Sequence, residues 1–377
     1  MKNEKFYINN AEYSPKNVLI IAEIGTSHGG NAEKAEDLIA AAAEAGANCI
    51  KFQIVYAHEI LHPNTGEVTL PGGKIRLYDR FKELELDPSF FERMKEIVEK
   101  KGLTFLCTPF GLQSARELKD LNPACIKIAS PELNYTSLLE EIGSYKLPTL
   151  LSTGVSRLGD IEEALLTLAK TQNLASFSNS TCLLHCVTSY PAPEEDYNLA
   201  VLKSLSTVFG VPVGVSDHSL SPCLVPVLAQ VFGAAVIEKH FCLSRSDSGL
   251  DDPIALPPSS FAKMVKELRL AEKNSPEDTL AGLKKEYGAE KINRIIGSGI
   301  KKLAPSEEAN YRRTNRSLHA LRDIKKGEII DESVVAVLRT EKILRPGLPP
   351  SFEKHIIGKT AKDFIPAGEG IRFEDIC

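Results

Sequence analysis

The sequence lacks any long apolar run and any dense cluster of basic residues. No window approaches the roughly 18 uncharged residues that a membrane-spanning helix needs, and residues 1–6 include no apolar stretch of the kind found in secretory signals. The formal net charge is -5, and Lys and Arg are scattered along the chain, so the sequence has no basic patch of the kind that binds nucleic acid. We therefore expect a cytoplasmic protein whose partners are small molecules rather than a membrane or a nucleic acid.

A Cys-x-x-Cys pair is also absent, which goes against a cysteine metal site and against a thioredoxin-like redox site. Most of the eight cysteines lie instead in apolar, strand-like runs. Those cysteines are Cys49, Cys107, Cys125, Cys182, Cys186 and Cys242. Free cysteine in such a run packs as a small hydrophobic residue, so the sequence predicts unpaired thiols rather than a disulfide framework.

Eight short apolar runs recur along the first two thirds of the chain, and several of the stretches between them are amphipathic. The runs are residues 18–25, 49–54, 104–108, 125–130, 149–154, 182–187, 211–216 and 236–241. The amphipathic stretches, 32–45, 90–101, 113–121 and 161–170, predict helices. Eight strand-helix units predict an α/β fold, a (β/α)8 TIM barrel over residues 1–273. Within residues 1–16, the alternating Phe6-Tyr-Ile8 followed by Asn9-Asn10 predicts a small hairpin that caps one end.

The rest of the chain divides into two parts. Residues 274–315 are polar and punctuated by glycine and proline, which predicts a linker that wraps over a surface. Residues 316–377 combine short strand-like runs with turns at Lys326-Gly327 and Ala367-Gly368, which predicts a small β-rich domain. A domain of this size is marginally stable alone, so we expect it to dock against another surface.

Nearly every run of the predicted barrel ends in polar residues. Catalytic groups of such barrels lie at the C-terminal ends of the strands. The candidates are Glu23, Lys51, Gln53, Thr108, Lys127, Ser130, Glu132, Ser152, Thr188, Tyr190, Ser216, Asp217, His218, Glu238, Lys239 and His240. A single buried lysine or histidine is more often structural than functional. So many charges at one end of a barrel would be costly to bury without a ligand or a metal ion, and together they predict an active site.

The candidate residues divide by their chemistry. Lys51 and Lys127, with the neighbouring hydroxyl groups, are suited to hold a phosphate and a carboxylate. The carboxyl groups of Glu23, Glu132 and Glu238 are suited to neutralise cations or to move protons. The pattern therefore predicts a site for a small anionic substrate.

Two histidines near the ends of neighbouring runs predict a divalent metal site with open positions for water or substrate. They are His218 and His240, and imidazole with oxygen ligands fits Mn, Zn, Fe or Co equally well. Lys239 lies between Glu238 and His240, but strand alternation points its side chain away from both neighbours, so we assign it a structural role.

A set of short motifs in a fixed order resembles the sialic acid (N-acylneuraminate) synthase family. The motifs are Ala22-Glu-Ile-Gly25, His28-Gly-Gly30, Ala45-Gly-Ala-Asn-Cys-Ile-Lys-Phe-Gln53, Cys107-Thr-Pro-Phe110, Lys127-Ile-Ala-Ser130, Leu151-Ser-Thr-Gly154, Tyr190-Pro-Ala-Pro193, Ser216-Asp-His218 and Glu238-Lys-His-Phe241. Arg316-Ser-Leu318 and Asp323-Ile-Lys-Lys-Gly-Glu328 resemble the antifreeze-like (SAF) domain that these synthases carry. The resemblance covers both the barrel and the small domain.

The resemblance implies a transferase that condenses phosphoenolpyruvate with an N-acyl mannosamine-type sugar and water. The products are a nine-carbon 2-keto acid, a nonulosonic acid such as sialic acid, and phosphate. By resemblance the phosphoenolpyruvate-binding residues are Lys51, Thr108, Lys127, Ser130, Ser152 and Ser216, and the sugar-binding residues are Gln53, Tyr190, Asp251 and Arg316. The catalytic residues are Glu23, Glu132, Glu238 and Asp251, of which Glu132 also meets the sugar.

The resemblance also implies a cofactor and a quaternary structure. His218 and His240 would bind a divalent ion, Mn²⁺ by family preference. The family pattern is a homodimer in which the antifreeze-like domain of one chain covers the barrel of the partner chain. Arg316 would then touch the N-acyl group of the sugar from that domain.

Departures from the family pattern leave the acceptor sugar open. Ser27 and Thr188 stand where the family usually has asparagine, and the 70–78 loop is unfamiliar. The acceptor could instead be a 2,4-diacetamido-6-deoxy sugar of the legionaminic or pseudaminic type.

Two alternative functions fit the sequence less well. The first is a synthase of 3-deoxy-octulosonate or 3-deoxy-heptulosonate, and the C-terminal domain counts against it because those enzymes need no such domain. The second is a non-catalytic carbohydrate- or ice-binding protein, which would need a flat, threonine-rich exposed face. Residues 316–377 contain only Thr340 and Thr360, which counts against this alternative.

Overall fold

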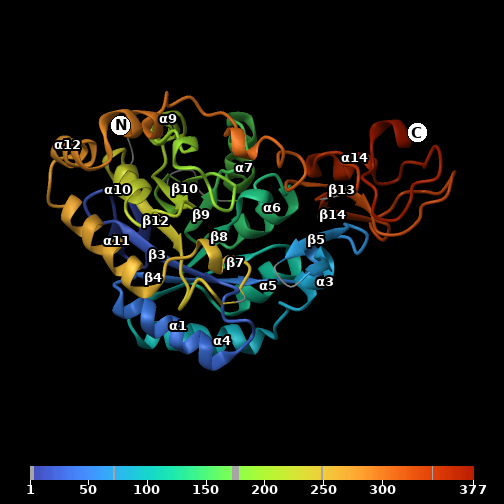
Figure 1. Ribbon diagram of the computed structural model, residues 1–377. Coiled ribbons are helices and arrows are strands. Elements are labelled where there is room, and N and C mark those ends of the chain that lie inside the picture. The colour runs from blue at the N-terminus through green and yellow to red at the C-terminus, as the bar shows by residue number, and fades with distance from the viewer. Residues whose placement is uncertain (1–3, 71–72, 172–177, 248, 342) are drawn as a thin grey trace.

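The computed structural model describes residues 4–70, 73–171, 178–247, 249–341 and 343–377, in which eight parallel strands form a closed barrel surrounded by helices (Figure 1). The strands are β3 (Leu19–Gly25), β4 (Cys49–Ile54), β7 (Thr104–Pro109), β8 (Cys125–Ile128), β9 (Thr149–Ser152), β10 (Thr181–Cys186), β11 (Val213–Asp217) and β12 (Ala234–His240). Strands that follow one another along the barrel sequence are also neighbours, and β12 closes on β3. The predicted TIM-barrel fold is confirmed.

Amphipathic helices cover the outside of the barrel. They are α1 (Ala32–Glu44), α4 (Pro88–Lys100), α5 (Leu112–Asp120), α6 (Thr136–Ser144), α7 (Leu158–Ala169), α9 (Val201–Phe209), α10 (Leu224–Val231) and α11 (Pro258–Ala271). Helix α1 shows why these segments fold as they do: the Asn31 side chain caps its N-terminus by accepting from the Lys34 amide. Its buried residues, including Leu38, Ile39 and Ala42, recur at helical spacing and face the strands.

The N-terminal end of the barrel is closed by a hairpin. Strands β1 (Phe6–Ile8) and β2 (Ala11–Tyr13) pair antiparallel, and Asn9 and Asn10 both have positive φ angles, as a tight two-residue turn requires. Phe6 and Ile8 are buried in one cluster with inward-facing residues of the barrel strands, such as Leu19 and Leu106. This apolar plug leaves the opposite, C-terminal end of the barrel for polar side chains.

The segment 274–315, expected to be a linker, contains two further helices. They are α12 (Pro276–Tyr287) and α13 (Ala289–Ile296), and α12 packs against α10 of the barrel layer. Beyond them the segment crosses the C-terminal end of the barrel, where two buried charged residues anchor it. Lys301 donates from Nζ to the Thr153 carbonyl at 2.8 Å. Glu307 accepts from the Val155 amide, also at 2.8 Å.

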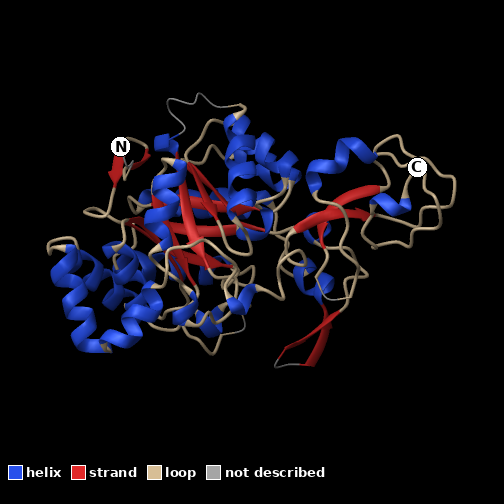
Figure 2. Ribbon diagram, turned by 90° about the horizontal axis from the view of Figure 1, so that it is seen from above, coloured by secondary structure: helices blue, strands red, loops and turns tan. Residues whose placement is uncertain are grey.

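The C-terminal residues form a small domain beside the barrel (Figures 1 and 2). Its two strands, β13 (Arg316–Ala320) and β14 (Val335–Arg339), pair antiparallel, and isolated bridges join the remaining extended segments. Leu318, Val337 and Ile371 belong to its buried apolar core. The short helix α14 (Glu353–Ile356) completes it. Because this apolar core is small, hydrogen bonds and ion pairs between side chains and the main chain also hold the small domain together.

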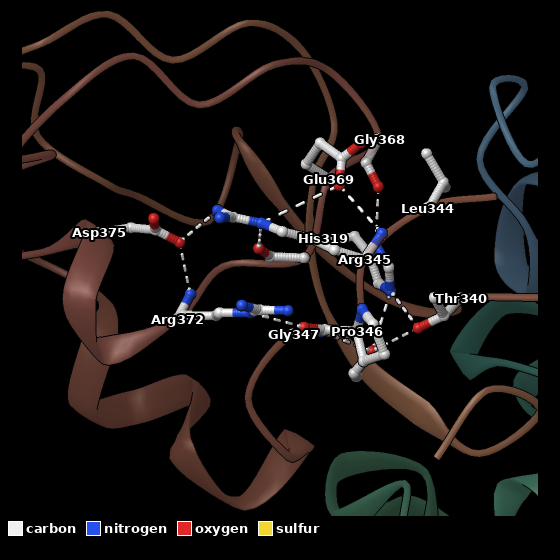
Figure 3. Close-up of polar contacts among 12 residues, drawn as sticks. His319, Thr340, Leu344, Arg345, Pro346, Gly347, Gly368, Glu369, Arg372 and Asp375 are labelled. Carbon is white, nitrogen blue, oxygen red and sulfur yellow. Dashed lines mark hydrogen bonds and ion pairs between the residues drawn. The ribbon is translucent and has the colours of Figure 1, made fainter. Parts of the chain in front are cut away.

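Figure 3 shows that polar bonding. The Arg345 guanidinium ion-pairs with Asp375 at 2.5 Å and donates to the Gly370 carbonyl. On the neighbouring strand, His319 Nδ1 lies 2.7 Å from the Gly368 carbonyl oxygen. These contacts join residues 368–375 both to Arg345 and to β13, so Arg345 helps to hold the small domain together.

A second hairpin leaves the barrel between β4 and β7. Strands β5 (Glu67–Leu70) and β6 (Gly73–Arg76) form it, helix α3 (Leu77–Lys82) follows it, and the short helix α2 (Ala57–Ile60) precedes it. This is the unfamiliar 70–78 loop of the sequence, of which residues 71 and 72 lie outside the described part. The hairpin projects from the body of the molecule (Figure 2).

Two expectations about composition can be compared with the structure. None of the helices in the described segments is both long enough and apolar enough to cross a membrane. The eight cysteines are unpaired: seven are buried and Cys377 is exposed. The prediction of free, packed thiols is confirmed.

Lys239 has the structural role that strand alternation predicts. Its fully buried ammonium group lies 2.6 Å from Asp217 Oδ2 and also donates to the carbonyl oxygens of Ser219 and Ser221. The contacts cross from β12 to the loop after β11. Burial lowers the pKa of Lys239, and the Asp217 carboxylate acts in the opposite direction. This ion pair therefore holds the loop that begins at His218.

We predict that Lys239→Met destabilises the protein by about 3–5 kcal/mol, because it leaves the Asp217 carboxylate buried without its partner. The measurement is the free energy of unfolding from urea titration. Lys170→Met is the matched control, since the Lys170–Glu140 pair is largely exposed, and a change within about 0.5 kcal/mol is expected there. Equal unfolding midpoints for the two variants would contradict the structural role.

Candidate active site

A cavity of about 240 Å³ lies at the C-terminal end of the barrel. Most of the residues that the sequence singled out line it. They are Glu23, Lys51, Gln53, Thr108, Lys127, Ser130, Ser152, Thr188, Tyr190, Ser216, His218, Glu238, His240 and Asp251. Glu132, Asp217, Lys239 and Arg316 are not among its lining.

Strand register explains this convergence. Glu23 of β3 stands opposite Lys51 of β4, and Ser216 of β11 stands opposite Glu238 of β12. Parallel strands of a closed barrel bring their C-terminal residues to one end, with alternate side chains pointing inward. Residues more than 200 positions apart in the chain therefore enter the same space.

The centre of the cavity is a buried cluster of two ammonium and two carboxylate groups. Lys51 Nζ lies 3.1 Å from Glu23 Oε2 and 3.4 Å from Glu238 Oε1. Lys127 Nζ lies 3.1 Å from Glu238 Oε1, to which Ser216 also donates at 2.8 Å. The formal charges balance before any substrate binds, which makes the burial of the cluster tolerable.

The two carboxyl groups of the cluster differ in pKa. Burial raises the pKa of Glu23 to about 7, although the Lys51 ammonium acts in the opposite direction. Burial acts to raise the pKa of Glu238 as well, but Lys127 and Lys51 together outweigh it and hold that pKa below its usual value. Glu238 is therefore ionised at neutral pH, while Glu23 can exchange a proton.

Hydroxyl groups next to the lysines are free to bind a substrate. Within the described part of the chain, Thr108 Oγ1 and Ser152 Oγ are buried without a hydrogen-bond partner. Ser130 Oγ, by contrast, accepts from the Gly154 amide at 3.0 Å. Buried polar atoms normally have partners, so unsatisfied hydroxyls beside two ammonium groups fit a bound oxyanion such as a phosphate or a carboxylate.

The two histidines line the same cavity with their ring centres 5.4 Å apart. His218 Nδ1 lies 2.8 Å from the Val187 carbonyl oxygen, a contact that requires Nδ1 to carry the proton and leaves Nε2 with a free lone pair. Burial lowers the pKa of His218 and of His240. Both rings are therefore neutral, which is the form that binds a metal ion.

These rings fit a metal ion in chemistry, while the rest of the coordination sphere is open. In the described segments, no group of three or more His, Cys, Asp or Glu side chains is arranged to hold a metal ion. Asp251 Oδ2 lies 3.7 Å from His240 Nδ1, and the Tyr190 ring stacks on His218 at 4.2 Å. His218 and His240 would hold a divalent ion, which would leave positions for solvent or substrate oxygens.

The structure differs from expectation at Arg316. The family resemblance places this residue against the sugar, but its guanidinium is completely buried and ion-pairs with Glu132 of its own chain at 2.9 Å. Burial lowers the pKa of Arg316, and Glu132 acts in the opposite direction. The reason is the docking of the small domain, which places the start of β13 directly behind Glu132.

Sequence reasoning missed Arg339, which does line the cavity together with Thr314. The signal was weak but present: Arg339 ends a run of alternating apolar residues in β14 and stands opposite Arg316 in the register of the two strands. Only the pairing of β13 with β14 shows that these two arginines lie at the same end of the small domain.

Comparison with known proteins places the chain in a family. Residues 38–278 match the NeuB family and residues 315–376 match the SAF domain. The chain is 34% identical to the N,N'-diacetyllegionaminic acid synthase of Campylobacter jejuni, covering 95% of this chain and 99% of that protein. It is 32% identical to a pseudaminic acid synthase of the same species, covering 96% and 97%.

A solved structure is similar over its whole length. The spore coat polysaccharide biosynthesis protein SpsE of Bacillus subtilis shares 32% identity, with a TM-score of 0.81 and 99% of each chain covered. With the closed barrel and the polar cavity at its C-terminal end, these matches show that the chain is an enzyme of the NeuB family that carries a C-terminal SAF domain.

Proposed function

We propose that this enzyme condenses phosphoenolpyruvate with the open-chain aldehyde form of an N-acyl amino sugar and with water, giving a nonulosonic acid and phosphate. The observation that carries the proposal is the single cavity that holds two lysines, unsatisfied hydroxyls and a pair of neutral histidines. Phosphoenolpyruvate is a small, strongly anionic substrate that needs such cationic and hydroxyl donors. Similarity to legionaminic and pseudaminic acid synthases supports the product class.

Phosphoenolpyruvate would bind at the lysine side of the cavity. Lys51 and Lys127 meet its negative charge, and the unpartnered hydroxyls of Thr108 and Ser152 donate to its oxygens. Ser216 would join them by turning its proton from Glu238 to the substrate. Ser130, whose Oγ already accepts from an amide, can still donate its proton. Because Glu238 shares both lysines, binding of the anion competes with Glu238 for them and holds the substrate next to an ionised carboxylate.

His218 and His240 would hold the divalent ion, for which we propose Mn²⁺. When bound, such an ion acts as a Lewis acid that polarises the carbonyl oxygen of the sugar aldehyde. The chain fixes the direction of the His218 ring through the Val187 carbonyl and the stacked Tyr190 ring. Asp251 and Tyr190, which contact His240 and His218, would meet the sugar there, and Gln53 would meet it from beside Glu23.

The two glutamates would divide the remaining chemistry. A bond from C3 of phosphoenolpyruvate to the aldehyde carbon leaves positive charge on C2, which the ionised Glu238 can stabilise electrostatically. Water then adds at C2, and Glu23, with a pKa of about 7, can accept the proton that this water loses. Cleavage of the bond between C2 and the phosphate oxygen releases phosphate and leaves the 2-keto acid.

Two classes of acceptor sugar compete. The first is an N-acyl mannosamine, and the second is a 2,4-diacetamido-6-deoxy hexose. Two Campylobacter relatives of 32–34% identity are a legionaminic and a pseudaminic acid synthase. A sialic acid synthetase from Leptospira borgpetersenii is 31% identical and the human N-acetylneuraminate-9-phosphate synthase 27%. Both acceptor classes are therefore tested.

We also propose a homodimer that exchanges its small domains, and a cytoplasmic location. The small domain docks on its own barrel in the described chain, and a second copy could supply the same contacts. Exposed apolar side chains on this domain, among them Ile329, Ile343 and Phe364, support an additional contact surface. Unpaired cysteines support a reducing compartment.

We expect the protein to release phosphate from phosphoenolpyruvate only when MnCl2 and a suitable acceptor are both present. The test is a panel that includes N-acetylmannosamine, its 6-phosphate and a 2,4-diacetamido-6-deoxy hexose, with phosphate release and product mass as measurements. Release without any acceptor would point to simple hydrolysis. No release with any member of the panel, in protein that binds Mn²⁺, would sink the proposal.

Removal of either histidine should abolish metal-dependent turnover. We expect His218→Ala and His240→Ala each to lower kcat by more than about 100-fold and to weaken Mn²⁺ binding measured by calorimetry, without unfolding the protein. His355→Ala, which removes an exposed histidine of the small domain, is the control. Full activity in either active-site variant would show that the assigned ligand is wrong.

Domain exchange predicts complementation between two inactive chains. Arg316→Ala should be inactive because it removes the side chain that docks the small domain on Glu132. Co-expressed with His240→Ala under random pairing, it should restore activity to about a quarter of wild type, because half of the dimers are mixed and each mixed dimer has one intact barrel covered by one intact small domain. Each variant alone is the control. Mixed dimers that stay inactive would show that each small domain serves its own barrel.

A further inference from the structure

Residues 301–315 cross the C-terminal end of the barrel, and we call this segment the strap. Its side chains bond to the main chain of the loop that follows β9. Lys301 Nζ donates to the Thr153 carbonyl oxygen at 2.8 Å, and Asn315 Nδ2 donates to the Val155 carbonyl oxygen at 3.1 Å. Both of these strap residues are buried, so solvent does not compete for the hydrogen bonds. The strap therefore fixes the course of this loop.

Glu307 joins this loop to the loop that follows β10. Its Oε1 atom accepts from the Val155 amide and from the Thr188 amide, each at 2.8 Å. Its Oε2 atom accepts from the Ala304 amide at 3.2 Å, and Asn310 Nδ2 donates to the Thr188 carbonyl oxygen, also at 3.2 Å. Glu307 is only 1% exposed. A carboxylate buried to this degree depends on its donors, so it holds the two loops at a fixed distance from each other.

Val155 has an unfavourable main-chain conformation. Its φ angle is 41°, in the left-handed region that a β-branched residue rarely adopts. A residue keeps such a conformation only where its surroundings determine it. Here both polar main-chain groups of Val155 bond to the strap, the amide to Glu307 and the carbonyl oxygen to Asn315. The strap therefore holds a turn that would otherwise relax.

This turn sets the positions of hydroxyl groups in the cavity. The amide of Gly154, the residue before Val155, donates to Ser130 Oγ at 3.0 Å. A Cβ atom at Gly154 would lie 2.2 Å from Thr188 Oγ1 and 2.9 Å from Ser130 Oγ, so the main chain of the turn packs directly against both hydroxyls. Ser152, just before the turn, has a buried hydroxyl without a partner in the described segments. A shift of the turn would therefore displace Ser130 and Ser152, which are proposed to bind phosphoenolpyruvate.

We propose that Glu307 is a positioning residue for phosphoenolpyruvate. Through the Val155 and Thr188 amides it holds the loops after β9 and β10 in the shape that presents their hydroxyl groups to the substrate. Glu307 is not among the described residues that line the cavity, so it acts through these loops and does not touch the substrate. The inference rests on the proposed function and deepens it by naming what shapes the phosphoenolpyruvate side of the site. The proposed metal ligands, His218 and His240, belong to other strand ends, so the acceptor side should be little affected.

The test compares wild type with Glu307→Ala and Glu307→Gln. We expect Glu307→Ala to raise the Kd of phosphoenolpyruvate, measured by calorimetry with MnCl2 present, by about 10- to 100-fold, because the turn loses its charged hydrogen-bond acceptor. KM for phosphoenolpyruvate should rise with it, while KM for the acceptor sugar stays within about twofold. Glutamine keeps one oxygen for the two loop amides but cannot accept from the Ala304 amide through its nitrogen. Glu307→Gln should therefore raise the Kd by only about 3- to 10-fold.

Glu308→Ala is the matched control, because Glu308 is the next residue of the strap and is exposed. Its Kd for phosphoenolpyruvate should stay within about twofold of wild type. An unchanged Kd in folded Glu307→Ala would overturn the proposal. An equal rise in KM for both substrates, or a lower kcat with both KM values unchanged, would also overturn it, since either result would show that Glu307 only supports the fold. If Glu307→Ala does not fold, as judged by circular dichroism, Glu307→Gln decides, and a Kd equal to that of wild type overturns the proposal.

The two proposals fail in different ways. Wild-type enzyme that neither binds phosphoenolpyruvate nor releases phosphate from it would reject the proposed function and this inference with it. Wild-type binding and turnover, combined with an unchanged Kd in the folded Glu307 variants, would reject this inference alone.

Discussion

The constraint on which the rest of the structure depends is the burial of Glu238 between Lys51 and Lys127. Charged groups at the mouth of a barrel cost free energy unless their charges are paired, and here two lysines and two glutamates pair within a few ångströms. The arrangement needs four strands to end in register and an apolar plug at the opposite end. Once formed, it is also a binding site, because an anionic substrate can replace a carboxylate as the partner of a lysine.

The small domain adds a second charged contact to the first. Glu132, which follows β8, is the point where both arginines of the β13–β14 pair meet the barrel. One of these arginines is consumed by the docking, and the other faces the cavity. The same contact therefore holds the domain in place and brings one of its side chains to the cavity.

Much of the barrel could be predicted from the sequence. Apolar runs of strand length separated by amphipathic stretches predicted the eight strands to within a few residues, because that periodicity reflects which faces are buried. Most of the polar residues at the run ends, from Glu23 to His240, also lie in one cavity. The helices α12 and α13 were missed, since a polar stretch with several glycine and proline signals resembles a loop until Ile292 and Ile295 are seen buried.

By itself, the sequence determined the fold class and the chemical types at the mouth of the barrel, because both follow from local periodicity and from residues at strand ends. Only the tertiary structure decided the roles of Arg316 and Arg339. Both are arginines on short strands with no local pattern to separate them. Which one is buried behind Glu132 and which one faces the cavity depends on how the small domain docks, and that contact joins residues about 200 positions apart.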